Sequence, residues 1–268
     1  MRPVLFKFFD MQITTYGTML AIALFACYFL ARRTFRQAGF KLSDTQIMDI
    51  CVLSVVSGVV GSRALYVLQN IGSFGSFFDL FKVWEGGLSF HGGLIGGTIA
   101  MVIYLKRKRI PVMRAGDAIL PCVLIGLSWG RIGCFMNGCC FGKVSSVPWA
   151  VQFPAGSPAF YKHQNLELLA EDATRSLAVH PAQFYATVLA VLTVMFLLWL
   201  QGKKKPDGTV LAASALVYGI TRFVLEFFRD DDVAMAGGLT QSQFLSMGIF
   251  AAGVLLFAVL SARSKATP

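Results

Sequence analysis

Long apolar segments separated by short polar connections dominate the chain. An α-helix needs about 20 apolar residues to cross a hydrocarbon core about 30 Å thick. Seven segments come close to or exceed that length, at about residues 14–31, 46–69, 88–105, 115–133, 183–201, 209–228 and 240–262. The pattern predicts an all-α integral membrane protein with seven transmembrane helices, forming one domain over residues 1–268.

The composition requires a solvent other than water for much of the surface. Of the 268 residues, 56% are hydrophobic and only 14% are charged, whereas a soluble domain carries about 25% charged residues. The mean hydropathy is +0.64. These values exclude a soluble globule, a disordered chain and a collagen-like chain. They indicate a membrane protein surrounded by lipid.

The net charge of +10 could indicate a nucleic-acid partner, but the basic residues lie in clusters between apolar segments, where they set topology. Seven spans place 14 of the 24 basic residues on one side, which the positive-inside rule makes cytoplasmic. These are Arg32, Arg33, Arg36, Lys41, Lys106, Arg107, Lys108, Arg109, Arg114, Lys203, Lys204, Lys205, Arg263 and Lys265. We therefore predict no nucleic-acid partner, an N-terminus outside and a C-terminus in the cytoplasm.

Two longer connections fall on the outer side, near residues 70–87 and 134–182. The second is rich in proline and polar residues, so it predicts a small extracytoplasmic cap without a long helical pattern. The first span is too long for the apolar region of a signal peptide. Arginines follow it where a cleavage site would have small residues, so we expect it to be retained.

Three arginines lie within spans, outside the topology clusters: Arg63, Arg131 and Arg222. A central arginine costs about 2.5–3.5 kcal/mol on insertion scales, so such residues usually mark a site. All three fall toward the outer side of their spans, as do His91 and Tyr16. A single arginine near a helix end can reach the headgroups without a function. Three arginines beside a histidine instead favour an anion site, because arginine binds phosphate through two parallel hydrogen bonds.

Tyr218 and Glu226 lie four residues before and after Arg222, on the same face of the predicted helix. They form a polar stripe on an otherwise apolar segment. Glu226 can neutralise a buried arginine structurally, and it can also hold Arg222 in place for a ligand.

Glycines are concentrated at two predicted span ends. In the first segment, Gly93 and Gly97 form a small-xxx-small pair typical of helix packing, and His91 precedes them as a candidate general base. The second segment, Gly130–Gly142, contains Arg131 and three cysteines, Cys134, Cys139 and Cys140. The cysteines can form a metal site, form a disulfide or fill small positions. Their spacing lacks the paired C-x2-C units of structural zinc, so no metal and no cofactor is expected.

These segments together resemble the phosphatidylglycerol:prolipoprotein diacylglyceryl transferase family. The resemblance covers nearly the whole chain in order. It rests on Tyr16–Gly17, Gly61–Arg63, Trp84–Gly87, Phe90–Gly96, Asp117, Gly130–Gly142, His180–Tyr185 and Tyr218–Arg229. Any one of these glycine-rich segments is weak support, whereas their order is specific.

The resemblance implies an enzyme of the bacterial cytoplasmic (inner) membrane. Such an enzyme transfers the diacylglyceryl group of phosphatidylglycerol to the lipobox cysteine in the signal peptide of a prolipoprotein. A thioether forms and glycerol 1-phosphate leaves. Because the acceptor supplies the thiol, no protein nucleophile is needed. The expected catalytic residues are His91, Arg131, Arg222 and Glu226, and the expected substrate-binding residues are Tyr16, Arg63, Asn137, Gly142 and Tyr218.

The sequence departs from the family pattern at three positions. Cys134 stands where the family commonly has asparagine, Cys139 where it commonly has glutamate, and Ala186 where glutamate is frequent. Two alternative functions follow from these departures. One is a membrane thiol redox protein that uses the three cysteines near residue 140, and the other is a non-enzymatic lipid-binding paralogue that keeps the arginines.

Overall fold

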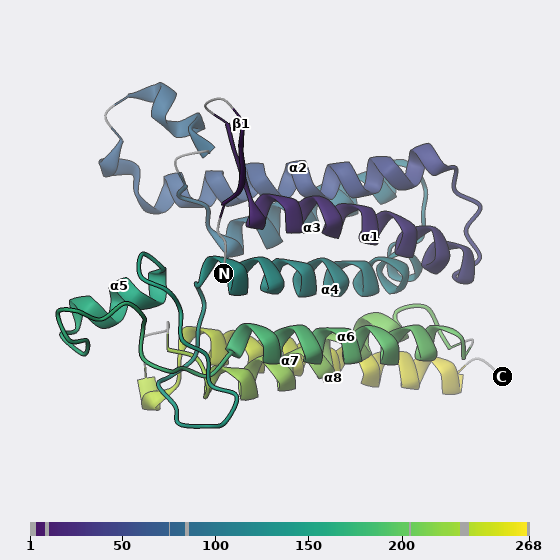
Figure 1. The fold of residues 1–268 in the computed structure, drawn as a ribbon. Coiled ribbons are helices and arrows are strands. Elements are labelled where there is room, and N and C mark those ends of the chain that lie inside the picture. Colours follow the sequence, from purple (N-terminus) through teal and green to yellow (C-terminus); the bar gives the residue numbers. More distant parts are fainter. Residues whose placement is uncertain are drawn as a thin grey trace.

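The computed structural model describes residues 4–8, 11–74, 76–83, 86–203, 205–230 and 236–266. Trp84, Glu85 and Lys204, which enter the sequence arguments above, lie outside these residues. Seven long helices run side by side (Figure 1). They are α1 (Thr15–Gln37), α2 (Asp44–Gln69), α3 (Phe90–Arg107), α4 (Val112–Asn137), α6 (Ala182–Gln201), α7 (Thr209–Glu226) and α8 (Gln241–Ala266).

Each predicted span coincides with one of these helices, with ends that differ by a few residues. Six of the helices are long and apolar enough to cross a membrane, so the chain is a multi-pass membrane protein. The exception is α3, whose mean hydropathy is lowered by four glycines, by His91 and by Lys106 and Arg107 at its end. That α3 is the seventh span stays a prediction.

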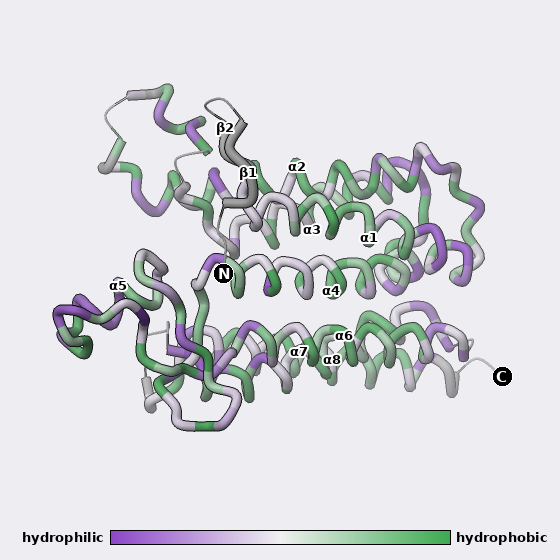
Figure 2. Tube along the Cα trace, viewed as in Figure 1, coloured by the Kyte–Doolittle hydropathy of each residue, from purple (hydrophilic) through white to green (hydrophobic). Residues whose placement is uncertain are grey.

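Apolar side chains cover the outside of the helices. On α2, Val52, Val55, Val56 and Val60 are all exposed, and Val60 reaches 63%. Water-soluble monomers rarely expose contiguous apolar surface of this kind. The exposed face of α2 is therefore suited to lipid. Figure 2 shows that hydrophobic residues are common along the helices, whereas hydrophilic residues gather toward the helix ends and the connections.

The connections divide between the two ends of the helices. The α1–α2, α3–α4 and α6–α7 connections lie at one end together with the C-terminus, whereas the N-terminus and the two longer connections lie at the other (Figure 1). The basic clusters of the sequence therefore gather at one end. This arrangement agrees with the predicted alternation of the spans, and the side of the membrane stays a prediction.

One small element departs from the all-α prediction. Strands β1 (Val4–Phe8) and β2 (Met11–Thr14) pair antiparallel just before α1. Both segments are rich in β-branched, aromatic and other apolar residues that fit a pleated ribbon. The predicted first span begins at about residue 14, and in the structure Thr14 is the residue that caps α1.

Close backbone contact holds α3 against α2. A Cβ atom built on Gly61 would lie 2.4 Å from the Gly92 carbonyl oxygen, and one on Gly92 would lie 2.3 Å from the Gly61 carbonyl oxygen. A Cβ atom on Gly96 would also lie 2.8 Å from the Gly61 Cα atom. The pair expected from sequence was Gly93 and Gly97, and in the structure Gly92 and Gly96 make the closest backbone approach.

Residues 138–181 form a folded segment at the end opposite the basic clusters. It contains α5 (Pro158–Asn165) and short β-bridges, among them Val144 with Val179 and Val151 with Val179. Val179 and Phe153 are fully buried there. Residues 134–137 of the predicted cap belong to α4, and that the rest forms an extracytoplasmic cap stays a prediction.

His163 is expected to make the stability of this segment depend on pH. The side chain is 1% exposed, and the Leu177 N–H donates to its Nδ1 atom at 3.2 Å. Burial lowers the pKa of His163 from its ordinary value of 6.5; Lys162 lowers it further and Asp230 opposes the shift. The folded state therefore favours the neutral ring. The unfolded state binds a proton first, so stability is complete above about pH 6.5 and falls as the pH drops toward the folded pKa.

We expect this loss to appear as faster proteolysis of residues 138–181 at about pH 5.5 than at about pH 7.5. A His163→Gln variant has no imidazole to titrate, so it should show a flatter pH dependence although it is less stable overall. His180→Gln is the matched control: it removes the half-buried histidine near the end of this segment, which contacts Tyr185, and should keep the pH profile of the unaltered protein. An unchanged pH profile in His163→Gln would assign the effect to other groups.

Candidate active site

A cavity of about 570 Å³ lies between five of the long helices. Its volume falls within the range of about 300–1,000 Å³ that is typical of small-molecule sites. The polar and cysteine residues lining it are Tyr16 from α1, His91 from α3, Arg131 and Cys134 from α4, Tyr218 and Arg222 from α7, Ser242 and Ser246 from α8, and Cys140 and Arg229 from the connections. The structure therefore brings together five of the nine predicted site residues, which are far apart in sequence.

The cavity is electropositive. Among the described residues that line it, three are arginines, Arg131, Arg222 and Arg229, and none is acidic. Charges separated from water by apolar walls interact more strongly than charges in solution. The lining suits an anion with several oxygens, because guanidinium groups bind such anions through paired hydrogen bonds.

Glu226 fixes two of these arginines from outside the cavity. Its side chain is 1% exposed and accepts a hydrogen bond from Arg222 Nη1, while Arg229 Nε lies 3.6 Å from its Oε2 atom. Thr240 Oγ1 donates to the other carboxylate oxygen at 3.1 Å. Arg222 Nη2 also donates to Ser242 Oγ at 2.9 Å. One carboxylate thus faces two guanidinium groups, so a net positive charge remains for a ligand.

The end of α4 is shaped to hold an aromatic ring. A Cβ atom on Gly133 would lie 2.9 Å from Tyr16 Cδ2. The absence of a side chain at Gly133 allows the first turn of α1 to pack its tyrosine closely beside Arg131. This contact explains the glycine at position 133, whereas a Cβ atom on Gly130 would meet nothing within 4 Å.

Two further cavities adjoin the main one. An apolar cavity of about 460 Å³ between α1, α2 and α4 shares Leu20, Val123 and Gly126 with it. A smaller one of about 60 Å³, between α4, α6 and α7, shares Arg131 and Arg222. The two arginines therefore lie between the main cavity and the small one, and neither is among the residues that line the apolar cavity.

Arg63 lies outside the residues that line the cavity. Its guanidinium donates to the carbonyl oxygens of Leu80, Asp79, Gly86 and Gly87, at 2.8, 2.6, 2.7 and 3.1 Å. In the same connection, a hydrogen bond from Lys82 lowers the pKa of Asp79 below its ordinary value. The hydrogen bonds from Arg63 therefore fix the conformation of the connection between α2 and α3.

Asn137 and Gly142 also lie outside the lining residues. Asn137 is the last residue of α4. Gly142 donates its N–H to the His180 carbonyl at 2.9 Å and forms a β-bridge with Arg229. A Cβ atom there would lie 2.5 Å from the Phe228 carbonyl oxygen. Gly142 thus lies where the segment that follows α4 meets the segments around His180 and around Phe228–Arg229.

Arg229 and Ser242 line the cavity although neither is among the site residues predicted from the sequence. The spacing offers a signal for Arg229, because it follows Glu226 by three residues and can reach the same carboxylate. No sequence signal marks Ser242, since α8 meets α7 only through tertiary packing.

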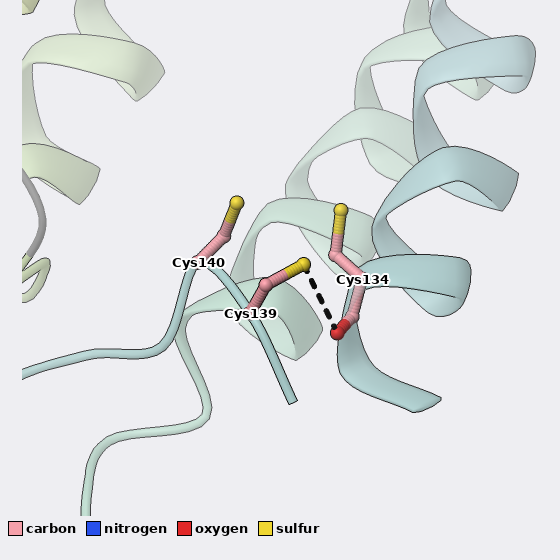
Figure 3. Close-up of side chains that lie close together, drawn as sticks. All are labelled: Cys134, Cys139 and Cys140. Carbon is pink, nitrogen blue, oxygen red and sulfur yellow. Dashed lines mark hydrogen bonds between the residues drawn. The ribbon is translucent and has the colours of Figure 1, made fainter. Parts of the chain in front are cut away.

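Three thiols gather at one wall of the cavity. The sulfur atoms of Cys134, Cys139 and Cys140 lie within 4.8 Å of one another and are half-buried (Figure 3). The Cys139 thiol also donates to the Cys134 carbonyl at 3.7 Å. Cys27, Cys51 and Cys122 lie elsewhere, within α1, α2 and α4.

In a multi-pass helical membrane protein, an arginine-lined cavity beside an apolar one is suited to a membrane enzyme or carrier of anionic amphiphiles. Comparison with known proteins narrows this class. Residues 3–259 match the family model of prolipoprotein diacylglyceryl transferase, and the chain belongs to that family. The match favours transfer chemistry over the thiol-redox and non-enzymatic alternatives.

Relatives of similar length carry the name phosphatidylglycerol–prolipoprotein diacylglyceryl transferase. One from Clostridium tetani is 30% identical over 257 residues, which cover 96% of this chain and 97% of the relative. One from Geobacter sulfurreducens is 33% identical, covering 99% of this chain and 97% of the relative. One from Methylococcus capsulatus is 35% identical, with 98% and 97% covered.

Proposed function

We propose that the protein transfers the diacylglyceryl group of phosphatidylglycerol to the lipobox cysteine of a prolipoprotein signal peptide in the bacterial inner membrane. The observation that carries this assignment is the cavity lined by three arginines and no described acidic residue, joined to an apolar cavity. A phospholipid with one phosphate and two acyl chains has the same division into an anionic part and an apolar part.

In this proposal the phosphate lies between Arg131 and Arg222. Part of the acyl chains occupies the apolar cavity, which adjoins the main one at Leu20, Val123 and Gly126. Tyr16 and Tyr218 bind the glycerol headgroup from the cavity wall. In this proposal Asn137 and Gly142 do not contact the substrate. They affect it only by fixing the position of the C-terminal end of α4.

The reaction is a displacement at carbon. The acceptor thiol gives up its proton to His91, and its sulfur attacks the diacylglycerol carbon that carries the phosphate. A C–S bond forms, the C–O bond breaks, and glycerol 1-phosphate leaves. The phosphate gains negative charge as it leaves, so paired guanidinium groups bind it more strongly in the transition state than in the substrate. Glu226 acts as a positioning residue for Arg222.

Transfer in a purified system tests this function. Protein in detergent is mixed with phosphatidylglycerol labelled in the diacylglyceryl group and with a lipobox peptide. We expect a labelled, base-stable thioether on the peptide, and none on a peptide with serine in place of the cysteine. Rescue of a transferase-depleted strain is the corresponding test in cells. A folded protein that binds the lipid but never labels the peptide would leave only the lipid-binding alternative.

The proposed topology has seven spans, including α3, with the N-terminus outside, the C-terminus in the cytoplasm and the 138–181 segment as an extracytoplasmic cap. Support comes from the basic clusters that share one end of the helices. Reporter fusions after Arg36, Arg109 and Lys205 should all report a cytoplasmic location. A fusion within residues 166–173 should report the opposite side, and one reversed fusion would contradict the topology.

A further inference from the structure

The end of α4 brings the three thiols together through local backbone geometry. Gly138 adopts a left-handed conformation, with φ at 75°, and the Cys139 N–H donates to the Cys134 carbonyl at 3.1 Å. A helix end of this kind places the side chains on either side of the glycine in contact. Cys140 then takes a positive φ of 58°, which is rare outside glycine.

The thiol cluster belongs to the wall of the main cavity. Cys134 and Cys140 both line the cavity, in which Arg131 and Arg229 are also found. The roles proposed above for the arginines, Glu226 and His91 leave the cysteines without a part in the chemistry. A cluster of three soft ligands, open to the chamber that receives a thiol substrate, therefore needs its own explanation.

We propose that Cys134, Cys139 and Cys140 hold a zinc ion whose fourth coordination position binds the acceptor thiol as a thiolate. This inference rests on the proposed transferase function and names a further site within it. Catalytic zinc sites supply three protein ligands and leave one position for substrate. A thiol that coordinates zinc is deprotonated, and the thiolate is the nucleophile that alkylation requires.

The distances fit this ion. Sulfur ligands at about 2.3 Å from a tetrahedral zinc lie about 3.8 Å from one another. The three sulfur atoms are already within 4.8 Å, so rotations of the cysteine side chains are enough to close them around the ion. The C-x4-C-C spacing, which argued against a metal in the sequence, is overcome by the reversal of the chain at Gly138.

The charges fit as well. Zinc with three thiolates carries one net negative charge, and a fourth thiolate adds another. Arg131 and Arg229 line the same cavity, and nearby cations reduce the cost of holding negative charge away from water.

The step balances without an oxidant or reductant. The acceptor S–H loses its proton to His91 as the sulfur binds the zinc. The sulfur then attacks the diacylglycerol carbon, and the bond from that carbon to the phosphate oxygen breaks. The thioether that forms is a neutral, weaker zinc ligand than the thiolate, so the product leaves and the ion keeps its charge and its three cysteines.

Metal content is the first test, and it does not depend on transfer. The full chain, purified in detergent under reducing conditions, should contain about one zinc per chain. Replacing zinc with Co²⁺ should give a thiolate-to-cobalt charge-transfer band. Single Cys134→Ser, Cys139→Ser and Cys140→Ser variants should each weaken zinc binding more than about tenfold. A Cys27→Ala, Cys51→Ala and Cys122→Ala triple variant is the matched control and should keep both the zinc and the band.

The open position is the second test. Adding a lipobox peptide to the Co²⁺ protein should intensify the charge-transfer band through a fourth thiolate, whereas the serine peptide should leave it unchanged. Transfer should fall on removal of zinc with a chelator and return on its addition. These readouts separate the two proposals. Transfer at full rate without metal, or with Cys134, Cys139 and Cys140 all replaced, would overturn the zinc site and leave the transferase proposal intact.

Two other results would overturn the zinc site directly. One is an air-purified protein without metal that carries a disulfide within the cluster and still transfers after reduction in metal-free buffer. The other is a protein that binds zinc but whose Co²⁺-substituted form shows no spectral change when the cysteine peptide is added. That result would limit the ion to a structural role. If no preparation transfers diacylglyceryl but zinc binds as described, the transferase proposal is the one that fails.

Discussion

Replacing Arg222 or Arg131 by lysine is expected to lower kcat/KM for diacylglyceryl transfer by about 100-fold or more. Lysine keeps the positive charge but loses the planar, two-pronged donor geometry of the guanidinium group. For Arg222 the loss also breaks a defined network, because its two terminal nitrogens donate to Glu226 and Ser242. The assay is the labelled transfer reaction, with expression and membrane insertion checked for each variant.

Glu226→Gln should give a milder defect of about tenfold in transfer. Arg222 and Arg229 keep their charge in this variant but lose the carboxylate that they share. Arg114→Lys is the matched control. Arg114 pairs with Asp207 at 3.0 Å and is 46% exposed at the end that carries the basic clusters. It should transfer at the normal rate. Full activity in both Arg131→Lys and Arg222→Lys would show that a point charge suffices or that the phosphate binds elsewhere.

Gly142→Ala is expected to destabilise the folded segment of residues 138–181. The added Cβ would lie 2.5 Å from the Phe228 carbonyl oxygen and 2.6 and 2.7 Å from His180 Cβ and its carbonyl oxygen. Two of these atoms are backbone, so the segments must move apart. Overpacking of this kind costs about 1–3 kcal/mol, and the hydrogen bonds from the Gly142 and Lys143 N–H groups, each 2.9 Å long, would lengthen.

Limited proteolysis of residues 138–181 and thermal unfolding in detergent measure this effect. Gly248→Ala in α8 is the control, because a Cβ there meets nothing within 4 Å and alanine favours a helix. It should be neutral or slightly stabilising. Normal protease resistance together with normal transfer in Gly142→Ala would contradict this prediction. It would show that the segments around Gly142, His180 and Phe228 can move apart without a measurable loss of stability.

The helices could be predicted from sequence because lipid imposes a simple rule of length and hydropathy. The convergence of Tyr16, His91, Arg131 and Arg222 followed from the same alternation of spans. The direction of Arg63 did not follow, because its partners are backbone carbonyls of a connection without a sequence signature. The role of the three cysteines stayed open for a related reason: the reversal at Gly138 and the positive φ of Cys140, which bring the three sulfur atoms together, have no sequence pattern that predicts them.

The glycine contact between α2 and α3 also bears on how the protein enters the membrane. α3 carries glycines, a histidine and two terminal basic residues, so it has little tendency to partition into lipid alone. Its glycines meet the α2 backbone at Gly61, and Arg63 holds the connection between the two helices. In the proposed seven-span topology, α2 and α3 would therefore enter the bilayer together, as a hairpin. A bulky residue at Gly61 would then strand α3 outside the bilayer and expose the chain to quality-control proteases before any enzyme is made.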